Sequence, residues 1–329
     1  MANPAAPAAP PEAGTAPGSP PTPPTRRWRW ALGGLAVVVT TALLATFGEQ
    51  LVGAAHEVAG RLVGGGRLYW SSGATAWQEL PIALLLRRDW GPTDAVITPD
   101  WSEVAPGLAL ADVKFARPPD PRDIDLVVVR IDPARWQFRV WGRADWSRAP
   151  VATLAQEAGL VLAVNAPYFA EDGPLGLVVS DGVSRNRQGS RRAAHFLVDR
   201  GGRPRIVNQK SADVSGVEQG FQGFPAIMTA GRTFSYLRTG GRGFDVRVAD
   251  RRTAACVTGD KRVLLVATDT WTGGLSLSEL ATALGALGCV DAMGFDGGAS
   301  TALSLHVGDT HREIRGLDTV PVIVGVSPR

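Results

Sequence analysis

Residues 290–301 read VDAMGFDGGAST, an apolar segment that stops at a carboxylate and continues with two glycines and two hydroxyls. We expect a buried strand over residues 290–295 that places Asp296 at the edge of a sheet. The glycines that follow allow a turn with positive φ and a close approach of a ligand to the backbone. A tight turn in which Asp296 is the hydrogen-bonding residue is the alternative. The donors that such a site offers to an anionic oxygen are the amides and hydroxyls of Gly297, Gly298, Ser300 and Thr301.

The segments upstream of this stretch alternate short apolar strands with turns. We predict a hairpin of residues 252–258 and 263–268. Helices are predicted over 150–159, after a proline, and over 276–287, where a capping box opens the helix. Further strands are predicted at 124–131, 136–141, 160–164, 176–180, 196–198, 205–207 and 320–326. The pattern indicates the α+β class, with a single sheet-rich mixed domain, a few packed helices and one N-terminal transmembrane helix before it.

The composition is that of a globular protein without a strong charge. The chain has 329 residues, of which 45% are hydrophobic and 20% are charged, and its net charge is +3. It contains no basic stripe with interleaved aromatic side chains, which argues against a nucleic-acid-binding class.

The first 66 residues are predicted to form a membrane anchor and its flanks. Residues 1–27 are rich in Pro and Ala without an apolar period, and we predict a disordered cytoplasmic tail. Residues 28–48 contain an uncharged run long enough for a transmembrane anchor, and the arginines before it keep the N-terminus in the cytoplasm. Residues 49–66 then form a helical stalk and a glycine linker. This predicts a single-pass protein of the cell membrane with its domain of residues 67–329 outside the cytoplasm. A cleaved signal peptide and a buried helix of a soluble domain are the alternatives.

Cys256 and Cys289 are the only two cysteines of the chain. Each lies in or beside a predicted strand, and the two strands could be neighbours. Outside the cytoplasm the thiols would then oxidise to a disulfide, and two unpaired buried thiols are the alternative. No Cys and His spacing is typical of a zinc site. We therefore predict no metal and no cofactor, while a divalent cation near Asp296 or Asp269 stays open.

A second group of candidate binding residues follows the predicted strand 160–164. Asn165 at the strand end has an amide that can hydrogen-bond a ligand hydroxyl, and the rings of Tyr168 and Phe169 offer flat faces to a sugar. Gly176 begins the next predicted strand. A capped turn with two core aromatics is the alternative for this segment.

Arg252 and Asp269 belong to the predicted hairpin. Alternation along the strand places Arg252 on one face with Ala254 and Cys256, where an unpaired charge would be costly. The guanidinium therefore needs a partner, which is either a bound phosphate or an internal carboxylate. Asp269 follows the second strand, and with Asp296 it could form the carboxylate pair used in glycoside hydrolysis. Aspartates that only form turns are the alternative.

Four segments together resemble the phosphodiester glycosidase family. They are NAPYF at 165–169, RTA at 252–254, GLSLSELA at 274–281 and DGGAST at 296–301. The family has similar segments in the same order, and the resemblance extends over about residues 104–326. The chain departs from the family pattern at Ala166-Pro167 and at Ala299, where the family has glycines.

The resemblance implies a hydrolase that cleaves the bond between a sugar's anomeric carbon and a phosphodiester oxygen. Some members of the family are linked to exopolysaccharides. Phosphate is a good leaving group, so Arg252 would stabilise its charge and Asp296 would act as base, nucleophile or electrostatic stabiliser. Asp269 is a weaker second carboxylate. The implied substrate-binding residues are Asn165, Tyr168, Phe169, Gly176, Gly297, Gly298, Ser300 and Thr301.

The expected partners are a sugar-1-phosphodiester or polysaccharide substrate and the membrane, through the N-terminal helix. The alternative function is a non-catalytic module of the cell envelope that binds phosphorylated carbohydrate or a polyprenyl-phosphate sugar.

Overall fold

The computed structural model describes residues 68–80, 95–117, 123–189, 194–208, 212–234, 236–239 and 246–329. These residues all belong to one compact unit of residues 52–329. The predicted tail and anchor, and the stalk of residues 49–66, lie outside the described residues. Within the described residues no helix is long and apolar enough to span a membrane.

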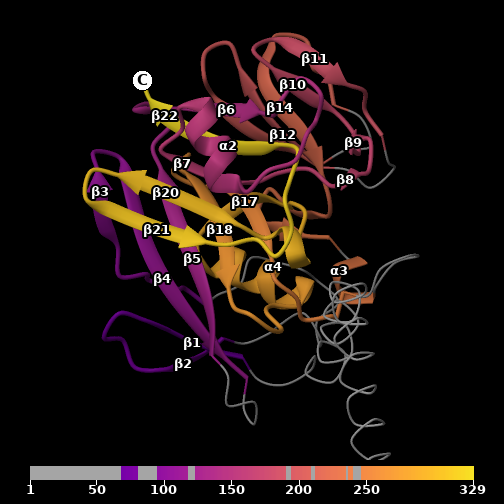
Figure 1. Cartoon of the computed structure of the whole chain (residues 1–329). Coiled ribbons are helices and arrows are strands. Elements are labelled where there is room, and N and C mark those ends of the chain that lie inside the picture. The colour runs from indigo at the N-terminus through magenta and orange to yellow at the C-terminus, as the bar shows by residue number, and fades with distance from the viewer. Residues whose placement is uncertain are drawn as a thin grey trace, which may run out of the picture. The chain divides into compact units, whose positions relative to one another are not determined.

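A ten-stranded antiparallel sheet forms the centre of the domain (Figure 1). Its strands in spatial order are β16 (Arg232–Thr233), β15 (Ala226–Thr229), β19 (Cys289–Gly294), β17 (Thr253–Thr258), β18 (Val263–Asp269), β5 (Asp123–Ile131), β4 (Leu108–Ala116), β1 (Leu68–Ser72) and β2 (Gln78–Leu80), with β3 (Ser102–Ala105) paired to β4. The predicted hairpin of residues 252–258 and 263–268 is confirmed as β17 and β18.

The middle of this sheet is buried on both faces. In β17, Ala255 and Val257 belong to one hydrophobic cluster, whereas Ala254 and Cys256 belong to another on the opposite face. The same alternation holds in β18 and β5. Continuous apolar runs are typical of parallel strands covered by helices on both faces. Here they occur in antiparallel strands, because further sheets cover one face and helix α4 (Leu277–Ala286) covers the other.

Two smaller antiparallel sheets pack on the face opposite α4. The first consists of β11 (Val183–Asn186), β10 (Val178–Ser180), β14 (Val217–Gly223), β12 (Ala194–Asp199) and β13 (Pro204–Val207). The second consists of β21 (Thr310–Ile314), β20 (Leu303–Val307), β7 (Leu162–Asn165), β22 (Ile323–Pro328) and β6 (Trp136–Trp141). A short hairpin of β8 (Phe169–Ala170) and β9 (Gly173–Pro174) adjoins them.

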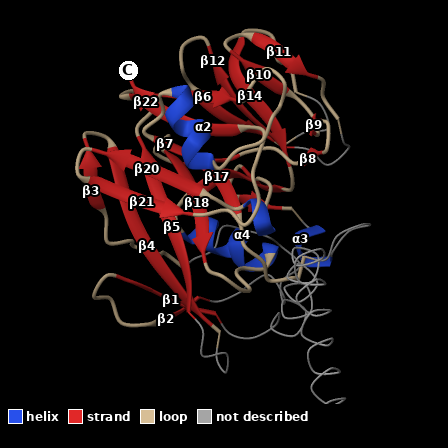
Figure 2. Cartoon of the chain, viewed as in Figure 1, coloured by secondary structure: helices blue, strands red, loops and turns tan. Residues whose placement is uncertain are grey.

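Few helices accompany these strands, so the mostly-β form of the α+β class is confirmed (Figure 2). Both predicted helices are present, as α2 (Val151–Ala158) and α4, and the described residues also include the short helix α3 (Tyr236–Thr239). Ser276 and Glu279 form the capping box of α4. The last strand begins at Ile323 instead of residue 320. Val320 makes only an isolated bridge with Ala149, because Pro321 after it has no N–H to continue the ladder.

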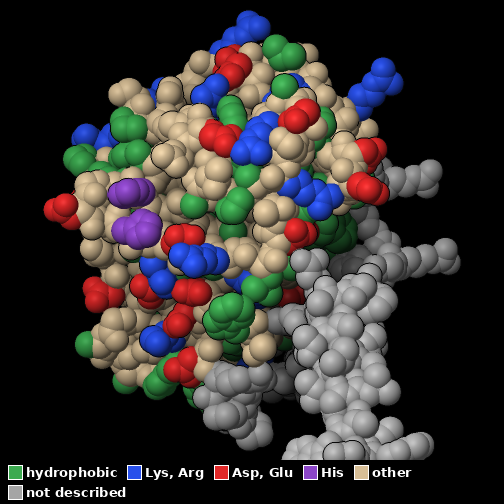
Figure 3. Space-filling view, viewed as in Figure 1, with side chains coloured by type: hydrophobic (Ala, Val, Ile, Leu, Met, Phe, Trp, Pro, Cys, Tyr) green, Lys and Arg blue, Asp and Glu red, His purple; other side chains and the backbone are tan. Residues whose placement is uncertain are grey.

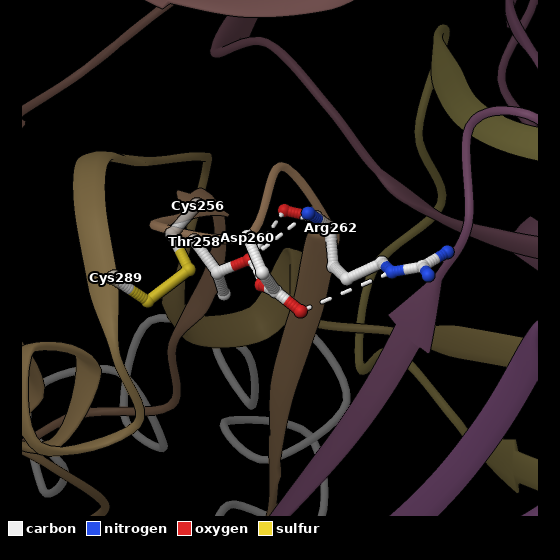
Figure 4. Close-up of a disulfide and its surroundings, with 5 residues drawn as sticks. All are labelled: Cys256, Thr258, Asp260, Arg262 and Cys289. Carbon is white, nitrogen blue, oxygen red and sulfur yellow. Dashed lines mark hydrogen bonds and ion pairs between the residues drawn. A yellow bond between two sulfur atoms is a disulfide. The ribbon is translucent and has the colours of Figure 1, made fainter.

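Cys256 and Cys289 form a disulfide that joins β17 to the start of β19. Figure 4 shows this bond beside the turn between β17 and β18, where the Thr258 hydroxyl is hydrogen-bonded to Asp260. Both sulfur-bearing side chains are buried on the α4 face. The bond therefore ties together two of the strands that end at the candidate site described below.

Removal of the disulfide is expected to destabilise the domain. It closes a loop with a sequence separation of 33 residues, and the restriction of the unfolded chain by such a loop is worth about 3–4 kcal/mol. The double variant Cys256→Ala/Cys289→Ala should lose roughly this much unfolding free energy in denaturant titrations. The wild-type protein measured in reductant is the matched control. A difference below about 1 kcal/mol would contradict the prediction.

Candidate active site

Three predicted site segments meet where three inner strands of the large sheet, β17, β18 and β19, have one of their ends, and we call this the site edge. Strand β17 is antiparallel to both β18 and β19, so its first residues lie beside the last residues of its two neighbours. The ladders continue past the strand ends, since the Phe295 amide donates to Thr253 O at 2.8 Å and the Thr268 amide donates to Arg252 O at 2.9 Å. Arg252, Asp269 and Asp296 are therefore brought to the same edge, as the sequence predicted.

Asn165 is the last residue of β7 in the second smaller sheet, and its side chain is hydrogen-bonded to residues at this edge of the large sheet. Its Oδ1 accepts from the Thr253 hydroxyl at 2.7 Å and from the Ala302 amide at 3.1 Å. Its Nδ2 donates to Asp296 O at 2.7 Å. The side chain is fully buried. The predicted hydrogen bond from Asn165 to a ligand is thus replaced by bonds to the protein, which give the residue a positioning role.

Arg252 lies at the start of β17 with its guanidinium directed toward the beginning of α4. Nε donates to Leu275 O at 2.9 Å, and one terminal nitrogen donates to Val248 O at 2.6 Å. Both acceptors are neutral carbonyls, and among the described residues no carboxylate forms an ion pair with this guanidinium. Burial lowers the pKa of Arg252, while the negative charge of Asp250 acts in the opposite direction. A partly buried cation without a bonded anion is suited to bind one.

Asp296 is partly buried on the same edge, and its acidity is strongly changed. Burial raises the pKa of this carboxyl to about 6, although hydrogen bonds from the Ser300 side chain and the Gly297 amide favour the charged form. The negative charges of Asp318 and Asp250 add to the rise. Such a carboxyl exchanges a proton near neutral pH, which is a common property of catalytic groups.

The backbone amides after Asp296 are not free, contrary to the sequence-based expectation. The Gly297 amide donates to Asp296 Oδ1 at 3.0 Å, and the Gly298 amide donates to Arg251 O at 2.8 Å. Only Gly298 has a positive φ, of 60°, whereas Gly297 is extended. The space beside Gly297 is nonetheless restricted, because a Cβ there would lie 2.8 Å from Arg251 O. The two glycines permit close packing instead of an open anion cradle.

The two hydroxyls that follow are both buried. Ser300 lies in the short 3-10 helix η2 (Gly298–Ser300) and bonds to Asp296. The Thr301 hydroxyl has no hydrogen-bond partner among the described residues. Its backbone carbonyl accepts from Arg251 at 2.9 Å. Ser300 therefore orients the carboxylate, whereas the Thr301 hydroxyl is buried without a partner.

Tyr168 lies near the charges of Asp296 and Arg252, whereas Phe169 and Gly176 contact other residues of their loop. The pKa of the Tyr168 phenol is raised by burial and by the charge of Asp296, and the charge of Arg252 opposes this rise. The Phe169 ring instead lies under the Arg148 guanidinium, 4.5 Å from its centroid. Gly176 has a φ of 122°, and a Cβ there would lie 2.6 Å from Gln222 Oε1. These two residues shape the neighbouring loop.

Asp269, the predicted second carboxylate, has an ion-pair partner in the structure. It forms an ion pair with Arg312 at 3.0 Å, and the charges that act on Asp296 come from Asp318 and Asp250. Asp250 also acts on Arg252 and Tyr168. The sequence contained a signal for it, because a residue two positions before Arg252 in an extended segment shares its face. Sequence reasoning missed Asp250 because it stopped at the predicted strand boundary.

Glu279, in the first turn of α4, interacts both with its own helix and with the charge of Arg252. Its carboxylate caps α4 through the Ser276 amide at 2.7 Å and forms a buried ion pair with Arg117 at 2.6 Å. The same negative charge raises the pKa of Arg252 against the effect of burial. One side chain thus supports the helix start and the charge of the guanidinium.

The alanines at positions 166 and 299, where the family pattern has glycines, are compatible with the backbone conformation at these positions. Positive φ angles among described non-glycine residues occur at Trp146, Asp181, Ala230 and Lys261 only. Ala166 and Ala299 are therefore in conformations that alanine adopts without strain. Ala299 is exposed. In the described part of the chain no group of three or more His, Cys, Asp or Glu side chains is arranged to hold a metal ion.

Comparison with known proteins identifies the family of this chain and agrees with its fold. A family model described as phosphodiester glycosidase (NAGPA) matches residues 158–327. The chain therefore belongs to the phosphodiester glycosidase family. No curated protein matches the sequence at a significant level.

Two solved structures share the fold at low sequence identity. A hypothetical protein from Synechocystis is 18% identical, with 80% of this chain and 68% of that chain covered and a TM-score of 0.54. The catalytic domain of zebrafish N-acetylglucosamine-1-phosphodiester alpha-N-acetylglucosaminidase, auto-inhibited by its pro-peptide, is 16% identical, with 74% and 87% covered and a TM-score of 0.55.

The Asp296→Asn variant should be more stable than the wild type near neutral pH but not in acid. The carboxyl has a pKa of 3.8 as the reference value for an unfolded chain and about 6 in the folded protein. The folded state therefore binds the proton more tightly, and stability falls as the pH rises through this window. We expect a gain of about 3 kcal/mol for the variant at pH 7 and no gain below about pH 4. Denaturant titrations at both pH values test this, and an equal gain at both would contradict the charge explanation.

Proposed function

We propose that the domain hydrolyses the bond between the anomeric carbon of a sugar and a phosphodiester oxygen. The observation that carries this proposal is the Arg252 guanidinium, held by neutral carbonyls at the same sheet edge as the Asp296 carboxyl. Membership of the phosphodiester glycosidase family supports the same reaction class.

The reaction needs charge stabilisation more than it needs an acid. As the anomeric C–O bond breaks, the electron pair goes to the phosphate oxygen, and Arg252 stabilises the negative charge of this leaving group. A water molecule supplies the new oxygen at the anomeric carbon and gives its proton to the Asp296 carboxylate. The products are the free sugar and a phosphomonoester. Since phosphate leaves as a stable anion, one carboxylate suffices for proton transfer.

The surrounding residues take supporting roles in this scheme. Asn165 and Ser300 fix the position of Asp296. Asp250 opposes excess positive charge and favours protonation of Asp296 by its own negative charge. The charges of Asp296 and Arg252 both act on Tyr168, and its ring offers a face to the sugar.

We also propose that the domain acts outside the cytoplasm, tethered by the apolar segment within residues 28–48. The Cys256–Cys289 disulfide supports an oxidising compartment. Acidic and basic side chains are intermingled on the face shown in Figure 3, so this face does not have the basic patch that a nucleic acid would need. A role in cell-envelope or exopolysaccharide metabolism follows from this location.

A non-catalytic module that binds phosphorylated carbohydrate is the second candidate. The observation that favours it is the internal use of the Gly297 and Gly298 amides, which leaves fewer backbone donors for a developing charge. Binding of a sugar-1-phosphodiester without release of free sugar would identify this function.

Variants of the charged residues test the catalytic assignment. Arg252→Ala and Asp296→Asn should each lower kcat/KM for a sugar-1-phosphodiester by roughly 10²–10⁴-fold, because each removes a group that acts on the transition state. Asp269→Asn is the matched control. It removes a partly exposed ion pair with Arg312 of β21, so we expect kcat/KM to change by less than about threefold. Near-normal activity of either site variant would remove that residue from the mechanism.

The pH dependence of the reaction gives a separate test. If Asp296 accepts a proton, it must be ionised, and its pKa of about 6 predicts that kcat/KM falls on the acidic side of this value. Rates measured between pH 4 and pH 8 with a constant ionic strength would show an acidic limb near pH 6. A profile that instead falls above about pH 6 would identify Asp296 as a proton donor.

A further inference from the structure

We propose that His306 and His311 together bind one divalent transition-metal ion, and that Zn²⁺ is the ion whose geometry they fit. This inference does not rest on the proposed function. His306 lies in β20 and His311 in β21, directly opposite each other in the register of this hairpin. The prediction of no metal considered spacing along the chain, whereas here the pairing of two strands brings the side chains together. They are the only exposed histidines among the described residues, and Figure 3 shows two histidine side chains side by side on the surface.

The backbone of the hairpin holds the two positions close together. Only two residues connect the strands, and the first of them, Gly308, has the positive φ, of 54°, that such a short turn needs. The His306 amide donates to Val161 O at 2.7 Å, so it points away from β21. The histidines are therefore a non-hydrogen-bonded pair of the antiparallel ladder. In such pairs the Cα atoms are about 4.5 Å apart and the side chains lie closest to each other.

Both histidine side chains lie on the solvent face of the hairpin. The neighbouring Leu305 belongs to the buried cluster, so the alternation along the strand turns the histidines to the opposite face. Arg312, beside them in the chain, is ion-paired with Asp112 and Asp269 at 3.0 Å each. Its positive charge is therefore balanced by two carboxylates and does not oppose a cation at the histidine pair.

The separation of the two rings matches that of two imidazoles on one metal ion. The ring centroids are 5.2 Å apart, the ring planes are inclined at 59°, and among the described residues neither ring forms a hydrogen bond or an ion pair. A zinc–nitrogen distance of about 2.0–2.1 Å places the centroid of a bound imidazole about 3.2 Å from the metal. At the tetrahedral angle, two such centroids are about 5.2 Å apart. The rings therefore have the spacing that a shared Zn²⁺ requires.

The chemistry of two facing histidines favours a metal over a contact between the rings alone. Two protonated imidazoles directly opposite each other repel, whereas a metal binds both rings in their neutral form. Imidazole nitrogens suit Zn²⁺, Cu²⁺ and Ni²⁺, while Mg²⁺ and Ca²⁺ prefer oxygen ligands. With two protein ligands, water molecules fill the remaining positions of a tetrahedral ion.

The test measures Zn²⁺ binding to the full chain by equilibrium dialysis at about pH 7.5, where an ordinary imidazole is mostly neutral. We expect one bound Zn²⁺ per chain. His306→Ala and His311→Ala should each weaken the Kd for Zn²⁺ by at least about tenfold, because each removes a direct ligand. His56→Ala, at a histidine outside the described residues, is the matched control and should keep the wild-type Kd.

Thermal unfolding gives a second readout. Zn²⁺ at about 100 times its Kd should raise the melting temperature of the wild type and of His56→Ala by about 5 °C. The same concentration should leave the melting temperatures of His306→Ala and His311→Ala unchanged, and Mg²⁺ should have no effect on any of the proteins. Without metal the two variants should unfold at the wild-type temperature, because both positions are exposed.

Four outcomes would overturn the proposal. They are no Zn²⁺ binding to the wild type, wild-type affinity in both single variants, Mg²⁺ binding as tight as Zn²⁺ binding, and one Zn²⁺ per two chains, which would mean a metal shared between two copies. None of these results bears on the glycosidase activity, since every variant retains Arg252 and Asp296.

Discussion

The side-chain amide of Asn165 is the contact on which the site depends. It accepts hydrogen bonds from Thr253 and Ala302 and donates to the carbonyl of Asp296, so a single buried group joins two sheets at the point where the site lies. A buried amide is costly unless its hydrogen bonds are made. The sheets therefore have one favourable relative position at this edge, and that position fixes the carboxylate.

Burial and hydrogen bonding have opposite effects on the ionisation of the site residues. Burial disfavours the charge of Arg252 and of Asp296 alike. Hydrogen bonds from Ser300 and Gly297 to Asp296 favour its charge but do not overcome burial, so the pKa of this carboxyl stays raised to about 6. An arginine starts from a pKa far above neutral and remains charged. The result is a permanent cation beside a carboxyl that gains and loses its proton, which suits departure of an anion with transfer of one proton.

The sequence predicted the strands and the site edge well, because both are encoded locally. The apolar runs of β17, β18 and β19 and the capping box of α4 are visible without tertiary information, and the register of an antiparallel sheet brings their ends together. The use of individual hydrogen bonds could not be predicted in this way. Whether the Gly298 amide faces a ligand or Arg251 O depends on chain segments about 47 residues apart.

The same limit applies to the prediction of the second carboxylate. Asp269 and Asp250 both flank predicted strands, and composition does not distinguish them. Their partners do, since Arg312 on β21 neutralises Asp269. That arginine comes from a different sheet, so only the folded arrangement shows that Asp269 is ion-paired and that the charge of Asp250 acts on Asp296.

The three interactions of Glu279 have a consequence for how this domain can evolve. The carboxylate that starts α4 also neutralises the buried Arg117 and acts on the guanidinium of Arg252. Selection for a different charge at the reaction centre therefore cannot act on this position alone, since any replacement would also disturb the helix origin and leave a cation stranded in the interior. A change of the charge at this position therefore carries a cost to folding as well as an effect on the site.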